Sequence, residues 1–208
     1  FIIFPILLIV LPFLIILKQP DLGTGLIILS LGFVIFFIVG VNIKFFIFCF
    51  IIFLISSPIL WNTLHQYQKQ RLLTFFDPYK DPLGTVYHII QSEIAIGSGG
   101  LFGKGWLKGT QSHLDYLPEK KTDFIFSMLG EEFGFIGTIT IIGFFILVCL
   151  VGYVISNNPE KDFFSKVLGI SIITNFFLSA ALNMAMVMGL TPVVGIPLPL
   201  VSFGGSSL

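Results

Sequence analysis

Long apolar runs are the strongest constraint on how this chain can fold. They cover residues 1–17, 22–40, 45–61, 123–155 and 164–190. A bilayer is crossed by about 20 apolar residues in helical form. Within lipid the backbone must satisfy its own hydrogen bonds, which helices do within one segment. We therefore predict an all-α, polytopic transmembrane helical protein with five spans, forming one membrane domain over residues 1–208.

Composition and residue spacing narrow the possible function classes. Only 11% of residues are charged and the mean hydropathy is +1.00, whereas soluble domains carry about a quarter charged residues. The net charge of zero provides no basic field for nucleic acid. His65, His88 and His113 show no metal-ligand spacing, and Cys49 and Cys149 lie inside apolar runs. No metal site built from side chains is predicted.

The two ends of the chain carry separate expectations. The sequence begins with Phe1, and no basic segment precedes the first apolar run, so it does not resemble a signal peptide. We expect the chain to be an internal piece of a longer protein. Near the other end, the tail after residue 190 is rich in proline and cannot form regular helix over its first half. Residues 195–206 are expected to wall a cavity, or to be a structural kink.

The large polar segment at residues 62–122 lies on the same side as the tail if five spans are present. The short loops on the opposite side carry Lys44, Lys161 and Lys166, whereas Lys18 is the basic residue of a short loop on the large-loop side. Basic residues of short loops favour the cytoplasm. We therefore predict that residues 62–122 form a large extracytoplasmic loop.

Asp123 stands where this polar loop enters the next apolar run. Thr122 precedes it as a plausible N-cap, and three apolar residues follow. A carboxylate at such a boundary is expected to be partly desolvated and suited to general-base chemistry. The alternative is that Asp123 only favours the positive end of the helix dipole.

Glu131 is predicted to share a helical face with Asp123. Asp123, Ser127, Gly130, Glu131 and Gly134 are related by steps of three or four residues, which places them on one face. An ionisable group two turns into a membrane helix indicates a functional site. An internal salt bridge or a polar contact between helices is the alternative.

The loop also combines lysines with glycines, in G-K-G at 103–105 and K-G-T-Q-S at 108–112. Ammonium groups beside exposed backbone N–H groups suit phosphate or pyrophosphate. The pattern is not a P-loop, because G-x-x-x-x-G-K-[ST] does not occur; a solvated loop is the alternative. Arg71 would hold a phosphate bidentately or place its charge at the membrane interface.

Several collinear segments resemble one bacterial family. They are Q-P-D-L-G-T (19–24), Y-Q-K-Q-R (67–71), D-P-L-G-T-V-Y-H-I-I-Q-S-E-I-A-I-G-S-G-G (81–100), G-K-G-W-L-K-G-T-Q-S (103–112), L-P-E-K-K-T-D-F-I-F-S (117–127), G-E-E-F-G-F-I-G (130–137) and V-V-G-I-P-L-P-L-V-S-F-G-G-S-S (193–207). Together they resemble the SEDS family (shape, elongation, division and sporulation proteins). Residues 193–199 are most similar to its RodA branch, since the FtsW branch typically has T-K-G at 193–195.

The resemblance implies a ten-helix fold of which the first four helices and the last are missing here. It implies a multi-pass protein of the bacterial plasma membrane that polymerises lipid II into peptidoglycan glycan strands during elongation. Implied partners are a class B penicillin-binding transpeptidase and other membrane proteins of the elongation complex. The family's essential aspartate corresponds to Asp123. Its acidic loop position, commonly Glu, corresponds to Asp115, Lys120-Lys121 replaces a basic-plus-His pair, and Phe203 replaces a frequent Tyr.

A mechanism follows from this resemblance. Undecaprenyl-pyrophosphate-linked glycan is the donor, the GlcNAc 4-hydroxyl of lipid II is the acceptor, and Asp123 takes the hydroxyl proton. The departing pyrophosphate would be stabilised by basic residues or by a divalent cation such as Mg²⁺ or Mn²⁺. The predicted substrate-binding residues are Arg71, Lys104, Lys108, Gln111, Ser112, Asp115, Glu119 and Glu131.

Two other function classes stay open on the sequence. A lipid II flippase or another transporter is one, although residues 22–40, 45–61 and 167–190 contain no ionisable side chain for a proton relay. A scaffold for the transpeptidase is the other, and it predicts that Asp123 is dispensable.

Overall fold

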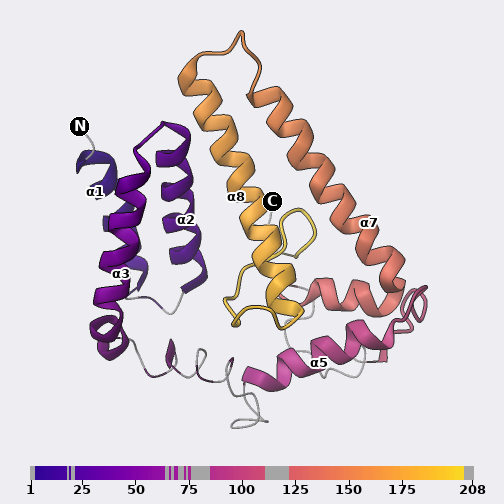
Figure 1. Ribbon diagram of the computed structural model, residues 1–208. Coiled ribbons are helices and arrows are strands. Elements are labelled where there is room, and N and C mark those ends of the chain that lie inside the picture. Colours follow the sequence, from indigo (N-terminus) through magenta and orange to yellow (C-terminus); the bar gives the residue numbers. More distant parts are fainter. Residues whose placement is uncertain are drawn as a thin grey trace. The chain divides into compact units, whose positions relative to one another are not determined.

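The computed structural model (Figure 1) describes residues 3–17, 19, 22–63, 66, 68–69, 73, 75, 85–110 and 122–203. Every regular element longer than a turn in these residues is an α-helix. The helices are α1 (Ile3–Leu17), α2 (Leu22–Ile38), α3 (Ile43–Thr63), α5 (Thr85–Ser98), α7 (Ile125–Ser156) and α8 (Phe163–Val187). The all-α class and the helices expected from the apolar runs are therefore confirmed, and the short helix α5 lies within the large loop.

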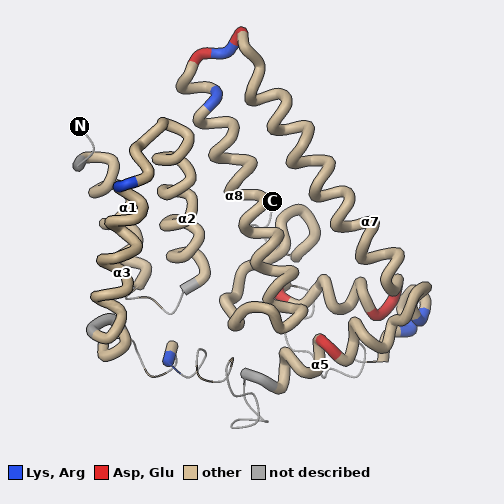
Figure 2. The backbone as a smooth tube through the Cα atoms, viewed as in Figure 1, with Lys and Arg blue, Asp and Glu red and all other residues tan. Residues whose placement is uncertain are grey.

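Two helices, α7 and α8, are long and apolar enough to cross a membrane. Shorter apolar stretches occupy the other runs, at Phe4–Leu17, Gly23–Ile38 and Ile43–Pro58. The crossing of all five helices stays a prediction. Residues 133–156 of α7 carry no charge, and Figure 2 shows charges before this stretch and in the loop that follows α7.

The chain forms two compact units. The first comprises Phe1–Leu72 and Gly152–Asn175, and the second comprises Leu73–Val151 and Phe176–Leu208. In the first unit, the side chain of Ile9 on α1 packs against Gly32 of α2, where the missing Cβ leaves room for it. Helix α2 also contacts α3 through Phe36 and Phe45, whose ring centroids are 5.7 Å apart.

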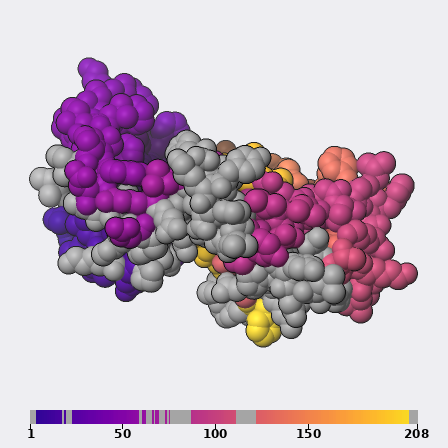
Figure 3. All heavy atoms as spheres, turned by 90° about the horizontal axis from the view of Figure 1, so that it is seen from below, coloured from indigo at the N-terminus to yellow at the C-terminus, as the bar shows by residue number. Residues whose placement is uncertain are grey.

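The second unit contains the predicted site. Its core is a cluster of buried apolar side chains from α5, the turn before α7, α7 itself, the second half of α8 and the tail: Ala95, Phe124, Phe126, Phe145, Ala180, Met186, Val187 and Leu198. Buried Ser92 of α5 also donates a 2.7 Å hydrogen bond to the carbonyl of Val187, at the end of α8. Figure 3 shows α5 and the loop after it, residues 85–110, at the surface of this unit.

A break inside α7 corrects the prediction of one continuous span from Asp123 to Ile155. Gly134 has φ 66° and ψ −160°, which is not helical. Residues 125–133 form a short first segment beside α5, and the chain then turns into 135–156 (Figure 1). The second segment is about 33 Å long at 1.5 Å per residue, enough to span a bilayer alone. Glu131 therefore belongs to the short segment before the break, and its depth in a membrane stays a prediction.

The tail after α8 is irregular, as its prolines predict. Residues 188–203 contain turns, bends and backbone without regular structure, and no helix. Val194, Ile196 and Leu198 are nevertheless buried. This segment therefore packs into the second unit as an ordered irregular strip, which requires partners for its backbone groups.

Candidate active site at the start of α7

The turn formed by residues 122–124 places Asp123 just before α7 begins at Ile125. Phe124 is buried in the core, and its ring lies 6.4 Å from the ring of His88 on α5. Asp123 is partly exposed. Asp123 thus lies in a turn whose next residue is anchored in the core.

The tail lies against Asp123. A Cβ built on Gly195 would come 3.6 Å from the Oδ2 atom of Asp123. Two side chains connect the same regions through the backbone. Asn183 of α8 bridges the carbonyls of Asp123 and Ile196, and Ser202 bridges the carbonyl of Thr122 and the N–H of Leu198. The carboxylate thus lies between the end of the large loop and the tail.

The loop after α5 enters the break in α7. Its N–H groups at Lys104 and Gly105 donate to the carbonyls of Glu131 and Glu132, at 3.0 Å each. Its carbonyls at Gly100 and Leu101 accept from the N–H groups of residues 135 and 136, at 2.9 and 3.2 Å. In an unbroken helix these four α7 groups would pair with each other. The loop backbone therefore supplies the hydrogen bonds that the break removes.

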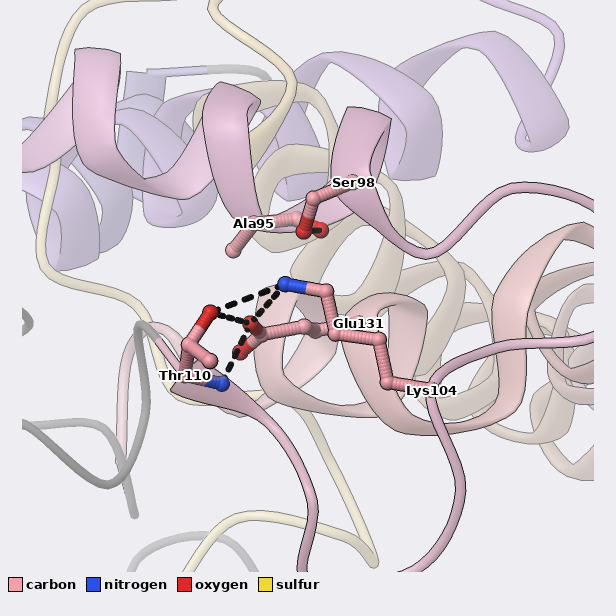
Figure 4. Close-up of polar contacts among 5 residues, drawn as sticks. All are labelled: Ala95, Ser98, Lys104, Thr110 and Glu131. Atoms are coloured by element: carbon pink, nitrogen blue, oxygen red, sulfur yellow. Dashed lines mark hydrogen bonds and ion pairs between the residues drawn. The ribbon is translucent and has the colours of Figure 1, made fainter.

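Glu131 closes this loop onto α7 (Figure 4). Its Oε1 atom accepts from the Nζ of Lys104 at 2.8 Å, and from the backbone N–H and the hydroxyl of Thr110 at 2.7 and 3.0 Å. Lys104 also donates to the Thr110 hydroxyl at 2.9 Å. The Glu131 side chain is fully buried, whereas that of Lys104 is 28% exposed. A buried carboxylate is tolerated because it has several charge-assisted donors.

The predicted site residues are thus divided. Lys104 and Glu131 come together as an ion pair, which is the salt-bridge alternative for Glu131, and Lys108 is exposed on the same loop. Asp123 lies at the turn before α7. Five others, Arg71, Gln111, Ser112, Asp115 and Glu119, fall outside the described residues and stay predictions.

The described residues also bear on metal binding. Within the part of the chain that the structure describes, no three His, Cys, Asp or Glu side chains come close enough to hold a metal ion. The divalent cation expected from the family stays a prediction.

Sequence reasoning did not single out Asn183. It is the fully buried amide on α8 that joins Asp123 to the tail. Its signal was present in the sequence, because a strongly polar side chain in an apolar run needs hydrogen-bond partners. Attention to ionisable residues alone passed over it.

Replacing Lys104 with Met is expected to destabilise the protein by about 1–3 kcal/mol, because the buried Glu131 carboxylate loses its cationic partner. Glu131→Gln should cost less, since the partly exposed Lys104 ammonium can be hydrated. The measurement is the thermal unfolding midpoint in detergent. Exposed Lys108 provides the matched control, and Lys108→Met should leave the midpoint unchanged. Equal midpoints for the two Met variants would contradict a stabilising ion pair.

Comparison with known proteins agrees with this architecture. The fold is that of a helical membrane protein. Its candidate site places Asp123 where a polar loop meets α7. The family model described as "Cell cycle protein", FtsW/RodA/SpoVE, matches residues 1–208. The chain belongs to this family, which is the SEDS family that the motifs indicated.

Individual relatives match between 71% and 98% of the chain. "Peptidoglycan glycosyltransferase MrdB" of Escherichia coli K12 is 45% identical over 204 residues, which are 98% of this chain and 55% of the relative. "Peptidoglycan glycosyltransferase RodA" of Treponema pallidum is 46% identical over 147 residues, 71% of this chain and 34% of the relative. A "Probable peptidoglycan glycosyltransferase FtsW" of Trichlorobacter lovleyi is 40% identical over 194 residues, 92% of this chain and 50% of the relative. The chain spans about half the length of most of these relatives.

A solved structure shares the fold. It is the structure described as "Structural coordination of polymerization and crosslinking by a peptidoglycan synthase complex". The TM-score is 0.78 at 28% sequence identity, covering 98% of this chain and 56% of the other. The MrdB and RodA relatives support the RodA-like assignment.

Proposed function

We propose that the intact protein is a peptidoglycan glycosyltransferase that polymerises lipid II, with Asp123 as its general base. The observation that carries the proposal is the placement of Asp123. Its backbone carbonyl is held by Asn183, and the residue is half-buried in the turn before α7. The relatives' names, which specify peptidoglycan glycosyltransferases, support the same activity.

The proposed reaction uses Asp123 at one step. The carboxylate accepts the proton of the GlcNAc 4-hydroxyl of lipid II as that oxygen attacks the anomeric carbon of the donor sugar. The bond from that carbon to the undecaprenyl pyrophosphate breaks, and the configuration inverts. A base that is held in place before substrate binds contributes about 10²- to 10⁴-fold to such a step.

Pyrophosphate stabilisation would fall to basic groups of the large loop. Lys108 is exposed on this loop. Lys104 already donates a hydrogen bond to Glu131. It would stabilise the pyrophosphate either while it keeps this bond or by exchanging it for a bond to the pyrophosphate. Arg71 and a divalent cation would also stabilise the pyrophosphate. This part of the proposal rests on the family resemblance.

We also propose a setting for this reaction. The donor and acceptor lipids would lie in the outer leaflet of the bacterial plasma membrane, with the protein crossing it several times. A class B penicillin-binding transpeptidase would be the partner. The related solved structure supports this pairing, because it is described as a complex that coordinates polymerisation with crosslinking.

The test uses the intact protein, purified with its transpeptidase partner, and labelled lipid II in detergent. Wild type is expected to form glycan polymer, and Asp123→Ala none. Polymer from both proteins would exclude Asp123 as the base. Without polymer from either, a lipid flippase assay in vesicles would decide whether the protein is a transporter.

A further inference from the structure

Asn183 occupies an unusual position for an amide in an apolar helix. Its side chain is 0% exposed. Its Nδ2 group donates one hydrogen bond to the carbonyl of Asp123 at 2.9 Å and another to the carbonyl of Ile196 at 2.6 Å. Since an amide nitrogen has two N–H groups, both donors are used. The amide therefore fixes the distance between Asp123 and the tail.

Ser202 makes a second, parallel connection. Its hydroxyl donates to the carbonyl of Thr122 at 2.7 Å and accepts from the N–H of Leu198 at 2.7 Å. The side chain is 7% exposed. Two consecutive carbonyls, those of Thr122 and Asp123, are thus tied to the same irregular segment by two buried side chains.

These contacts decide what borders the Asp123 carboxylate. Gly195 of the tail, which has φ +73°, lies against this carboxylate, because a Cβ built on it would come 3.6 Å from the Oδ2 atom. Buried irregular backbone is stable only where its polar groups are paired. Without the two ties, the carbonyl of Ile196 and the N–H of Leu198 would lose these partners, and the tail could move relative to Asp123.

We infer that Asn183 and Ser202 are positioning residues, which hold the Asp123 backbone and the 194–198 segment together so that the carboxylate keeps its place beside Gly195. This inference rests on the proposed function. A displacement of about 1 Å in a reacting group costs on the order of a hundredfold in rate. Neither side chain is exposed enough to bind lipid II itself. Their loss should therefore lower kcat and leave the KM for lipid II nearly unchanged.

The experiment measures steady-state polymerisation of lipid II by the intact protein with its partner. Asn183→Leu keeps the approximate shape and removes both donors, and kcat should fall about ten- to a hundredfold. Asn175→Leu is the matched control, because Asn175 is an exposed amide on the same helix, and its kcat should not change. Ser202→Ala should lower kcat in the same way, whereas Ser202→Thr keeps a hydroxyl and should restore most of it.

The double variant adds a check on the shared role. Because both ties hold the same pair of segments, the combined loss should be smaller than the product of the single losses. Each variant is first compared with wild type by its thermal unfolding midpoint. Should Asn183→Leu fail to fold, the Ser202→Ala and Ser202→Thr pair decides the result.

The outcomes separate this inference from the proposed function. A folded Asn183→Leu variant with wild-type kcat overturns the inference, as does equal activity of Ser202→Ala and Ser202→Thr. In either case polymer from wild type and none from Asp123→Ala leaves the proposed function standing. A KM increase with unchanged kcat also overturns the inference, since that result would indicate a role in binding.

Discussion

Asp123→Asn should lower the rate of glycan polymerisation by about 10²- to 10⁴-fold, the range that general-base catalysis supplies. Asparagine has nearly the same size as aspartate, and the backbone ties to Asn183 and the core do not involve the carboxylate. The variant should therefore fold, keep the KM for lipid II and lose kcat. Polymer length and yield from labelled lipid II provide the measurement.

Asp123→Glu is the informative companion to this variant. It retains the base but moves it by about one methylene, so its activity should fall between those of wild type and Asp123→Asn. Wild-type activity in Asp123→Asn would exclude a base at this position. The unfolding midpoints of both variants should match wild type, which separates catalysis from stability.

Gly103→Ala is expected to lower the stability of the protein more than an alanine at Gly100 or Gly97 would. Gly103 has φ +78°, and a Cβ there would collide with the carbonyl of Glu132. The left-handed backbone costs an alanine about 1–2 kcal/mol, and the collision also disrupts the hydrogen bonds that the loop supplies to α7. We expect a total loss above about 3 kcal/mol, measured as a lowered thermal unfolding midpoint.

Two nearby glycines separate the cost of the left-handed backbone from the cost of the collision. Gly100 has φ +57° but open space around a built Cβ, so Gly100→Ala should show only the backbone cost. Gly97 lies in α5 with open space and no positive φ, and Gly97→Ala should equal or exceed wild-type stability, since alanine favours helix. The expected order of midpoints is Gly97→Ala, then Gly100→Ala, then Gly103→Ala. A Gly103→Ala midpoint equal to that of Gly100→Ala would contradict the collision.

The helices were predictable because apolar runs determine them almost alone. Hydropathy identified α1, α2, α3, α7 and α8. The break at Gly134 was not predictable in the same way. One glycine within an apolar pattern is compatible with a continuous helix, and the break is stabilised by loop residues about 30 positions earlier in the chain.

The site was only partly predictable for a related reason. Asp123 was indicated by its position at the edge of an apolar run, and the pairing of Glu131 was one of two open interpretations. The choice between them depended on where Lys104 lies, which is a long-range contact. Asn183 acts through backbone carbonyls of residues 123 and 196, and carbonyl partners leave no side-chain pattern in a sequence.

The loop inserted at the break of α7 limits how the chain can vary in length. Two of its carbonyls, at 100 and 101, and two of its N–H groups, at 104 and 105, must meet fixed partners on α7. Surface loops usually tolerate insertions and deletions. Here, adding or removing one residue between positions 101 and 104 would shift one pair out of register with the other. Engineered tags or cleavage sites therefore belong outside residues 100–105, even though this segment lies at the protein surface.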